Sequence, residues 1–156
     1  MVDNRVIAGY GTLEVRLHKD AEWDDILDVD RLSFPKSEAW KPSDFGRAGT
    51  VQVALVDGQI MAYAAWRRSR GVLWLLRIAV LPQFRRRGIA SLLIRQKTRK
   101  VHDWGCSGEG IVRCVVPEES LPAQLLFRSL GWIADGTAEG HFRFILRPEW
   151  CEVSRP

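Results

Sequence analysis

The residues with the clearest chemical potential form a basic loop at the expected start of a helix. Three consecutive arginines, Arg85, Arg86 and Arg87, are followed by Gly88 and an amphipathic stretch; residues 85–88 are called the arginine loop below. Backbone N–H groups in the first turn of a helix have no intrahelical partner, and with the helix dipole they attract phosphate. Guanidinium groups add charge-assisted hydrogen bonds to phosphate oxygens. The pattern therefore predicts a diphosphate site, in which Gly88 and Ala90 leave room for the ligand.

Two other phosphate-binding loops are excluded by the same stretch. It contains neither GxxxxGK followed by Ser or Thr, the loop of ATP-binding proteins, nor the GxGxxG of dinucleotide-binding folds. It also lacks an acidic residue where a ribose clamp is expected. ATP and NAD are therefore disfavoured, and the remaining alternative is an ordinary basic surface turn before an amphipathic helix.

The elements that position this loop follow from hydrophobic periodicity. Alternating apolar residues predict strands, and apolar residues three or four positions apart predict helices. Asp20 is the expected N-cap of the first helix, Asp57-Gly58 suits a two-residue hairpin turn, and 67–71 turns the chain again. In chain order we expect a strand at 13–17, a helix at 21–33, a short helix at 45–48, strands at 51–56, 59–66 and 72–80, a helix at 88–104, a strand at 111–116, a helix at 121–130, and final strands that include Trp132 and 142–146.

These elements predict a single mixed α/β domain over residues 1–156, with 1–11 and 148–156 as terminal extensions. Strand 72–80 is almost wholly apolar except for Arg77, so it is expected to be central and covered on both faces. The helix after it and strand 111–116 complete a right-handed crossover, which makes the two strands parallel. A chain of this length can bury a core of ordinary size without disulfides or metal ions.

Charge and composition exclude several classes of protein. A net charge of +4 and a pI near 9.2 can attract a polyanion, but a mild basic excess is more often a solvated surface. Nucleic-acid binding through Arg67, Arg68, Arg70 and the arginine loop is therefore only a third hypothesis. No apolar run approaches the roughly 20 residues of a membrane span, and no secretion signal is recognisable, so we expect a cytoplasmic protein. The cysteines and histidines lack metal-ligand spacing, so no metal is expected. Cys114, inside an apolar strand, is expected to be a packing residue.

Two motifs, in order along the chain, resemble those of the GCN5-related N-acetyltransferase (GNAT) superfamily. The first is Arg85-x-x-Gly88-x-Ala90 after the strand and turn Ile78-Ala79-Val80-Leu81-Pro82, and the second is Ala123-x-x-Leu126-Phe127-x-x-x-Gly131-Trp132. The similarity extends over nearly the whole chain. It implies a mixed, mostly antiparallel central sheet with a splayed parallel strand pair, flanked by about four helices.

The resemblance also implies an enzyme that transfers an acetyl group from acetyl-CoA directly to a primary amine, without an acyl-enzyme. Main-chain groups of Ile78 and Val80 would pair with the pantetheine arm, and a nearby N–H would stabilise the oxyanion. The residues expected to bind the cofactor are Ile78, Ala79, Val80, Arg85, Arg86, Arg87, Gly88, Ile89, Ala90, Ser91, Ser120 and Phe127.

Within the superfamily the chain looks most like the ribosomal-protein-alanine N-acetyltransferases, through Ser33-Phe34-Pro35, the Ile-Ala-Val strand and 116–131. A protein or peptide N-terminal amine is therefore the expected acceptor. The chain departs from these enzymes where Val115 replaces their base, Ser120 their asparagine and Phe127 their tyrosine acid. Their long final hairpin shrinks to about 133–141, which favours a small-molecule amine as the alternative acceptor.

The acid and base of the reaction are hypotheses. An amine must lose a proton before or during attack, and Glu118 and Glu119 are the candidate bases, although solvated carboxylates ahead of a helix are an equally good interpretation. The leaving thiolate would be protonated by water or by Tyr63. Because the usual acid and base are missing, a non-catalytic acyl-CoA-binding regulatory module is a second class of function. Phe34 and Trp40 lie in the segment that covers the acceptor side in relatives, with the core as their other interpretation.

Overall fold

The computed structural model describes residues 3–7, 11–99 and 111–146. The chain divides into two compact units, the first formed by 1–66 and 77–94 and the second by 67–76 and 95–156. The prediction of a single domain stays a prediction. Within the described ranges, no helix combines the length and apolar character that a membrane crossing needs.

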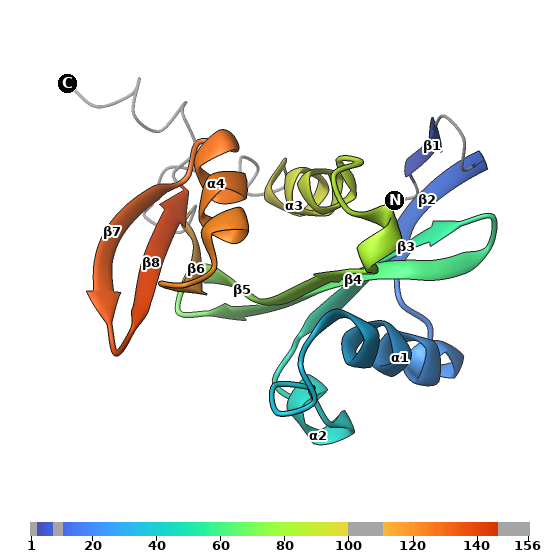
Figure 1. The fold of residues 1–156 in the computed structure, drawn as a ribbon, viewed down its shortest axis with the longest axis horizontal. Coiled ribbons are helices and arrows are strands. Elements are labelled where there is room, and N and C mark those ends of the chain that lie inside the picture. Colours follow the sequence, from blue (N-terminus) through green and yellow to red (C-terminus); the bar gives the residue numbers. More distant parts are fainter. Residues whose placement is uncertain (1–2, 8–10, 100–110, 147–156) are drawn as a thin grey trace. The chain divides into compact units, whose positions relative to one another are not determined.

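The first unit is an antiparallel sheet with helices on both faces (Figure 1). Its strands follow the order β1-β2-β3-β4-β5, and α1 and α2 cover one face while the beginning of α3 covers the other. The elements are β1 (Asp3–Ile7), β2 (Gly11–Leu17), α1 (Trp23–Ser33), α2 (Pro42–Phe45), β3 (Thr50–Val56), β4 (Gln59–Ser69), β5 (Val72–Val80) and α3 (Ile89–Arg99), of which β4, β5 and α3 continue into the second unit.

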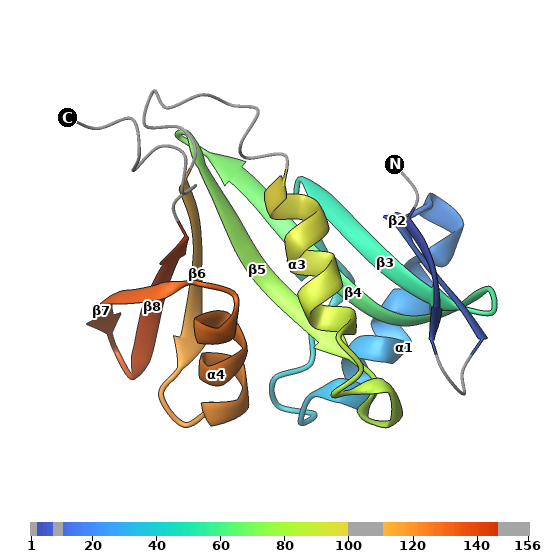
Figure 2. The ribbon, with the colours of Figure 1, turned by 90° about the horizontal axis from the view of Figure 1, so that it is seen from above.

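The second unit pairs the beginning of β5 with three further strands and carries α4. The strand order is β5-β6-β8-β7, and the elements are β6 (Ile111–Pro117), α4 (Leu121–Ser129), β7 (Ile133–Ala138) and β8 (His141–Leu146). Strands β5 and β6 are parallel, in register from Val72↔Ile111 to Leu75↔Cys114, whereas β8 is antiparallel to both β6 and β7. Figures 1 and 2 both place α4 beside β6. The predicted mixed sheet with a parallel pair and about four helices is therefore confirmed for the described residues.

The secondary structure differs from prediction at the N-terminus, in the turn after β4, and in α2, which spans Pro42–Phe45 rather than 45–48. Residues 3–7 form β1 and pair with β2, so 1–11 is not merely an extension. Strand β4 runs to Ser69, and the broad turn expected at 67–71 is only Arg70-Gly71, with φ of 52° and 76°. These angles are nearly those of the correctly predicted Asp57-Gly58 turn, 49° and 83°, and both turns suit the twist of a hairpin. The end of the predicted helix after 99 and the extension 148–156 lie outside the described residues.

The first helix begins differently from prediction. A single 3-10 turn, Asp20–Glu22, precedes α1, so Asp20 is not its N-cap. The Glu22 carboxylate closes this turn by accepting a hydrogen bond from the Lys19 N–H at 2.7 Å. The same carboxylate forms a two-bond pair with the Arg16 guanidinium of β2, at 2.8 and 2.7 Å. The start of α1 is thereby tied to the sheet, because a bidentate pair fixes orientation as well as distance.

This pair predicts an acid-sensitive contribution to stability. The hydrogen bond from Arg16 is the largest cause that lowers the pKa of Glu22 from 4.5 to about 2. Because the folded pKa lies below the unfolded one, the contribution is present above the unfolded pKa and is lost as pH falls toward the folded value. Glu22→Gln should lower the free energy of unfolding by about 1–2 kcal/mol at neutral pH and flatten its fall in acid, as measured by urea unfolding across pH. An equally steep acid loss in the variant would contradict this assignment.

Candidate functional site

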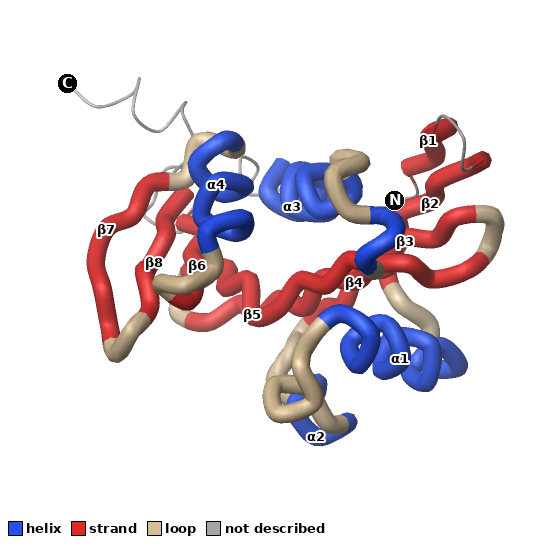
Figure 3. The backbone as a smooth tube through the Cα atoms, in the orientation of Figure 1, coloured by secondary structure: helices blue, strands red, loops and turns tan. Residues whose placement is uncertain are grey.

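The arginine loop has the backbone geometry of a phosphate-binding helix start. A 3-10 turn, Pro82–Phe84, leads into the loop, and α3 begins at Ile89 (Figure 3). The first helical hydrogen bond runs from the Leu92 N–H to the Gly88 carbonyl at 3.0 Å, so Gly88 is the N-cap. The N–H groups of Ile89, Ala90 and Ser91 precede this bond and have no intrahelical acceptor. Three backbone donors therefore stand at the positive end of an 11-residue helix.

Two residues of the loop adopt left-handed backbone conformations, Arg86 at φ 62° and Gly88 at φ 79°. Among the described residues, no atom lies within 4 Å of the point where a Cβ on Gly88 would stand. The glycine is therefore required by its backbone angle rather than by crowding from the protein. The space beside the helix start is open, and donors, dipole and exposed guanidinium groups all fit a diphosphate.

The three arginines, which the sequence pattern treats alike, differ in their surroundings. Arg85 donates from Nε to the Val80 carbonyl at 3.0 Å and from Nη2 to the Ser33 carbonyl at 3.2 Å. These two bonds make Arg85 a brace within the first unit. All three arginines are exposed, so each can meet an anionic ligand from solvent, and the two bonds of Arg85 hold its side chain close to the loop.

Strand β5 leads into this loop with one face less covered than predicted. Leu75 and Ala79 are buried. At the alternate positions of the strand, Trp74, Ile78 and Val80 are only half-buried. The expectation that β5 is covered on both faces is therefore wrong, because burial alternates along the strand as it does on a partly open sheet face. The parallel pairing recorded for the described residues ends at Leu75↔Cys114, although β5 continues for five residues.

A buried polar cluster lies on the α1 side of the sheet, all within the first unit. Asp30 of α1 is 0% exposed, and its carboxylate accepts hydrogen bonds from four groups. The donors are the Tyr63 hydroxyl of β4, the Trp40 N–H at 2.6 Å, and Arg77 Nε and Nη2 at 2.8 and 3.2 Å. Arg77 Nη2 also donates to the Glu38 carbonyl at 2.8 Å. A fully buried carboxylate is thus paired with a partly buried guanidinium, and the carboxylate receives the hydrogen bonds that its burial requires.

Aromatic rings enclose the Arg77 guanidinium. Its carbon lies 3.6 Å from the centroid of the Phe34 ring and 5.1 Å from that of Trp40, both within the range of a cation–π contact. Trp40 in turn meets Phe45 edge-on at 4.9 Å, and Phe45 lies 5.4 Å from Tyr63. Phe34 and Trp40, the two aromatics noted in the sequence, therefore flank Arg77. In the sequence, Arg77 stood out only as a charged residue in an apolar strand. A polar residue in an otherwise apolar stripe, as at Asp30 and Arg77, was the signal available.

Tyr63 does not fit the hypothesis of a proton donor to a leaving thiolate. Its ring is 0% exposed and its hydroxyl proton is directed at Asp30. Burial, and next the hydrogen bond to Asp30, raise the pKa of Tyr63 far above its ordinary value. A phenol that holds its proton so firmly, and donates it inside the protein, is a structural group rather than an acid.

The raised pKa can be checked by titration, since the chain has two tyrosines, Tyr10 and Tyr63. Wild type and Tyr63→Phe should develop the same tyrosinate absorbance up to about pH 11, because Tyr63 keeps its proton in the folded protein and adds nothing to the signal. A folded pKa above the unfolded one also means that stability falls as pH rises past about 10, and this fall should be smaller in Tyr63→Phe. Twice the tyrosinate signal in folded wild type, with circular dichroism as the control for folding, would show that Tyr63 is accessible after all.

The candidate bases lie in the second unit, on the turn between β6 and α4. Glu118 and Glu119 are both exposed. The backbone of Glu118 is fixed, since its N–H donates to Gly140 at 3.0 Å and its carbonyl accepts from Gln124 Nε2 at 2.7 Å. Ser120 is the residue before α4, but its side chain makes no capping hydrogen bond. These geometries leave the two glutamates as exposed carboxylates on a well-held turn.

Phe127 and Cys114 are core residues of the second unit. Phe127 is 3% exposed and packs against Trp132 and Phe144, at centroid distances of 4.9 and 5.9 Å. Cys114 is buried, and burial raises the pKa of its thiol well above the ordinary value. The prediction that Cys114 is a packing residue agrees with this. A contact between Phe127 and the cofactor stays a prediction, beside a clear packing role.

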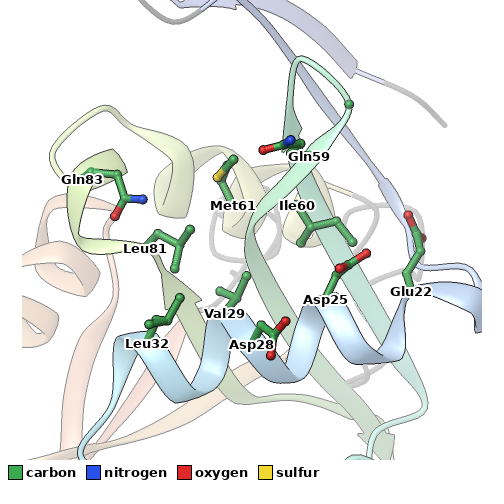
Figure 4. A pocket seen from close by; sticks show the side chains of 11 residues that line it. Glu22, Asp25, Asp28, Val29, Leu32, Gln59, Ile60, Met61, Leu81 and Gln83 are labelled. Carbon is green, nitrogen blue, oxygen red and sulfur yellow. The ribbon is translucent and has the colours of Figure 1, made fainter.

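A pocket of about 520 Å³ also lies in the first unit, between α1, the β3–β4 turn and the residues before the arginine loop. Figure 4 shows apolar side chains, among them Val29, Met61 and Leu81, with carboxylates along the helix. Of these carboxylates, Glu22 is paired with Arg16, and Asp28 with Arg31 at 2.7 Å. None of the predicted site residues lines this pocket.

Comparison with known proteins agrees with this geometry. A sequence model of the acetyltransferase (GNAT) family matches residues 14–132, a span that includes the arginine loop, the Asp30–Arg77 pair and α4. No curated protein matches significantly.

Solved structures resemble the chain closely in fold and distantly in sequence. The GNAT domain of PAT from S. lividans has a TM-score of 0.76 at 15% identity, covering 94% of this chain and 97% of that one. The ribosomal-protein-S18-alanine N-acetyltransferase of Escherichia coli has 0.73 at 16% identity, covering 86% and 93%. The PaiA N-acetyltransferase of Thermoplasma acidophilum, solved in complex with coenzyme A, has 0.71 at 13% identity, covering 87% and 99%. At these identities the likeness shows the fold.

Proposed function

Because the chain belongs to the acetyltransferase (GNAT) family, we propose that it transfers an acetyl group from acetyl-CoA to the N-terminal amine of a protein or peptide. The observation that carries the proposal is the start of α3. There the N–H groups of Ile89, Ala90 and Ser91, the dipole of an 11-residue helix and the exposed Arg86 and Arg87 suit the diphosphate of CoA.

Each predicted cofactor residue has a distinct role in this proposal. Arg86 and Arg87 neutralise phosphate, and Gly88 supplies the left-handed turn that aims the backbone donors. Arg85 holds the loop against Val80 and Ser33 and adds a further exposed guanidinium beside the phosphates. The backbone of Ile78 to Val80, where Ile78 and Val80 are half-buried, pairs with the pantetheine arm and supplies the N–H that stabilises the oxyanion.

The acyl transfer is direct in this proposal. The free amine attacks the thioester carbonyl, the carbon–sulfur bond breaks, and the thiolate of CoA takes a proton from water. The amine loses its proton to Glu118 or Glu119, directly or through water, since both carboxylates are exposed and can exchange protons with solvent. Cys114 takes no part, because a buried thiol with a raised pKa is a poor nucleophile.

The acceptor has one alternative that a specific observation favours. Strands β7 and β8 are six residues each and are joined by the turn Glu139-Gly140, so the final hairpin is short. A short hairpin offers little surface along which a peptide could lie, and this favours a small-molecule amine. The N-terminal amine is supported by the fold likeness to the ribosomal-protein-S18-alanine enzyme.

An acceptor screen tests the proposal. Acetyl-CoA and enzyme are incubated with peptides that differ in their first residue and with a panel of polyamines and amino sugars, and products are identified by mass spectrometry. Acetylation confined to free peptide N-termini supports the proposal, with the same peptides blocked at the N-terminus as the matched control. Acetylation of small amines alone would move the function to the alternative acceptor. Saturable acetyl-CoA binding without turnover of any amine would instead favour a regulatory acyl-CoA-binding module.

A further inference from the structure

The segment between α1 and α2, residues 34–41, is fastened to α1 at one point and to β5 at another, and the end of α1 that precedes it is fastened to the arginine loop. Asp30 accepts a hydrogen bond from the Trp40 N–H at 2.6 Å, Arg77 donates to the Glu38 carbonyl at 2.8 Å, and Arg85 donates to the Ser33 carbonyl at 3.2 Å. All of these residues belong to the first unit. The segment carries no regular secondary structure of its own between α1 and α2, so these side chains decide where it lies.

The Asp30–Arg77 pair at the centre of these contacts is a costly way to stabilise the fold. Asp30 is 0% exposed and the Arg77 side chain 13%, and moving two such charges out of water is strongly unfavourable before their attraction is counted. An apolar pair of similar size commonly stabilises a protein as well or better. What an apolar pair lacks is direction: the carboxylate receives four donors, and Arg77 reaches both Asp30 and Glu38. The cluster therefore defines positions more than it adds stability.

The cluster lies next to the part of β5 whose backbone is proposed to bind the thioester. Arg77 directly precedes Ile78, the first of the three β5 residues whose main chain is proposed to meet the thioester arm. Successive side chains of a strand point to opposite faces, so anchoring the Arg77 side chain on the α1 side fixes the orientation of the peptide group between 77 and 78. An oxyanion donor displaced by even a fraction of an ångström loses much of its effect.

We propose that Asp30 and Arg77 are positioning residues for acetyl transfer: their buried pair holds the Ile78 peptide group where it polarises the thioester carbonyl. The inference rests on the proposed function and names the residues that prepare its reacting backbone. It follows that loss of the pair slows the chemical step while the phosphate-binding start of α3 still binds acetyl-CoA.

The experiment uses three variants and one matched control. Asp30→Asn keeps the shape of the side chain and removes its charge, Arg77→Lys keeps the charge and removes the forked geometry, and Asp30→Asn/Arg77→Gln replaces both charges by neutral partners. Asp28→Asn removes a carboxylate from the same helix, where it is exposed and paired with Arg31, and serves as the control. Thermal unfolding establishes which variants are folded.

Two measurements that need no acceptor, together with kcat, distinguish a positioning role from general damage to the structure. Calorimetry gives the Kd of acetyl-CoA, and the infrared carbonyl stretch of bound, carbonyl-labelled acetyl-CoA reports polarisation of the thioester without any acceptor. In Asp30→Asn we expect a Kd within about twofold of wild type, a carbonyl stretch that returns toward its value in free acetyl-CoA, and a kcat at least about tenfold lower with a peptide bearing a free N-terminal alanine. In Arg77→Lys the carbonyl stretch and the kcat should lie between those of wild type and Asp30→Asn, because lysine keeps the positive charge.

A folded Asp30→Asn with the wild-type carbonyl stretch and kcat overturns the inference, and so does a parallel loss of acetyl-CoA affinity in all three variants. If Asp30→Asn does not fold, the same two readouts on Arg77→Lys decide between these outcomes. Failure of wild type itself to bind acetyl-CoA is a different result, since it refutes the proposed function.

Discussion

Reversing two of the three exposed charges of the arginine loop, in Arg86→Glu/Arg87→Glu, should weaken acetyl-CoA binding at least about a hundredfold. Each charge-assisted hydrogen bond to phosphate contributes about 1.5–3 kcal/mol, and about 1.4 kcal/mol corresponds to a tenfold change in affinity. The variant loses these bonds and places two carboxylates beside a diphosphate, so repulsion adds to the loss. Isothermal titration calorimetry with acetyl-CoA measures the change.

The matched control for this prediction is Arg99→Glu, a charge reversal of an exposed arginine at the other end of α3. It changes net charge without touching the loop, so its affinity should stay within about threefold of wild type at moderate salt, where distant exposed charges are screened. Equal losses in the loop variant and in Arg99→Glu would mean that only overall charge matters. Unchanged binding in the loop variant would remove Arg86 and Arg87 from the site.

Truncating Phe127 to alanine should lower the free energy of unfolding by about 3–5 kcal/mol, the usual cost of removing a buried aromatic side chain. The ring is 3% exposed and lies between Trp132 and Phe144, so its loss leaves a cavity in the core of the second unit. Urea unfolding followed by tryptophan fluorescence measures the change, because Trp132 reports directly on this packing.

A second substitution of Phe127 distinguishes a packing role from a contact with the cofactor. Phe127→Leu keeps much of the apolar volume, so it should recover most of the stability lost in Phe127→Ala. Acetyl-CoA affinity should follow the folded fraction in both variants if packing is the role of the ring. A stable Phe127→Ala with strongly reduced acetyl-CoA affinity would show instead that the ring contacts the cofactor.

The fold and the arginine loop could be predicted because their signals are local. Period-two alternation marked β2, Asp57-Gly58 marked a hairpin, and the arginines before Gly88 marked a helix start that can bind phosphate. Each depends on neighbours in sequence, where backbone preference and periodicity act directly. The parallel pairing of β5 with β6 was predictable for a related reason, since a strand, helix and strand connect in few ways.

The buried cluster could not be predicted, because its members are far apart in sequence. Asp30 and Arg77 are separated by 47 positions, and nothing in either neighbourhood announces the partner. Arg85 is predicted to be a phosphate ligand from its arginine neighbours, and the sequence did not show that its donors also reach carbonyls of Val80 and Ser33. Tyr63 looked available as an acid because sequence does not reveal that a buried carboxylate takes its proton. Tertiary contacts decide such roles.

The central claim is that the start of α3 binds the diphosphate of acetyl-CoA, and a pair of calorimetric titrations tests it most directly. Wild-type protein is titrated with acetyl-CoA and with S-acetylpantetheine, which carries the same thioester arm without the phosphates. The account predicts saturable one-to-one binding of acetyl-CoA, at least about a hundredfold tighter than that of S-acetylpantetheine. Equal affinities for the two compounds, or no saturable binding of acetyl-CoA, would contradict it.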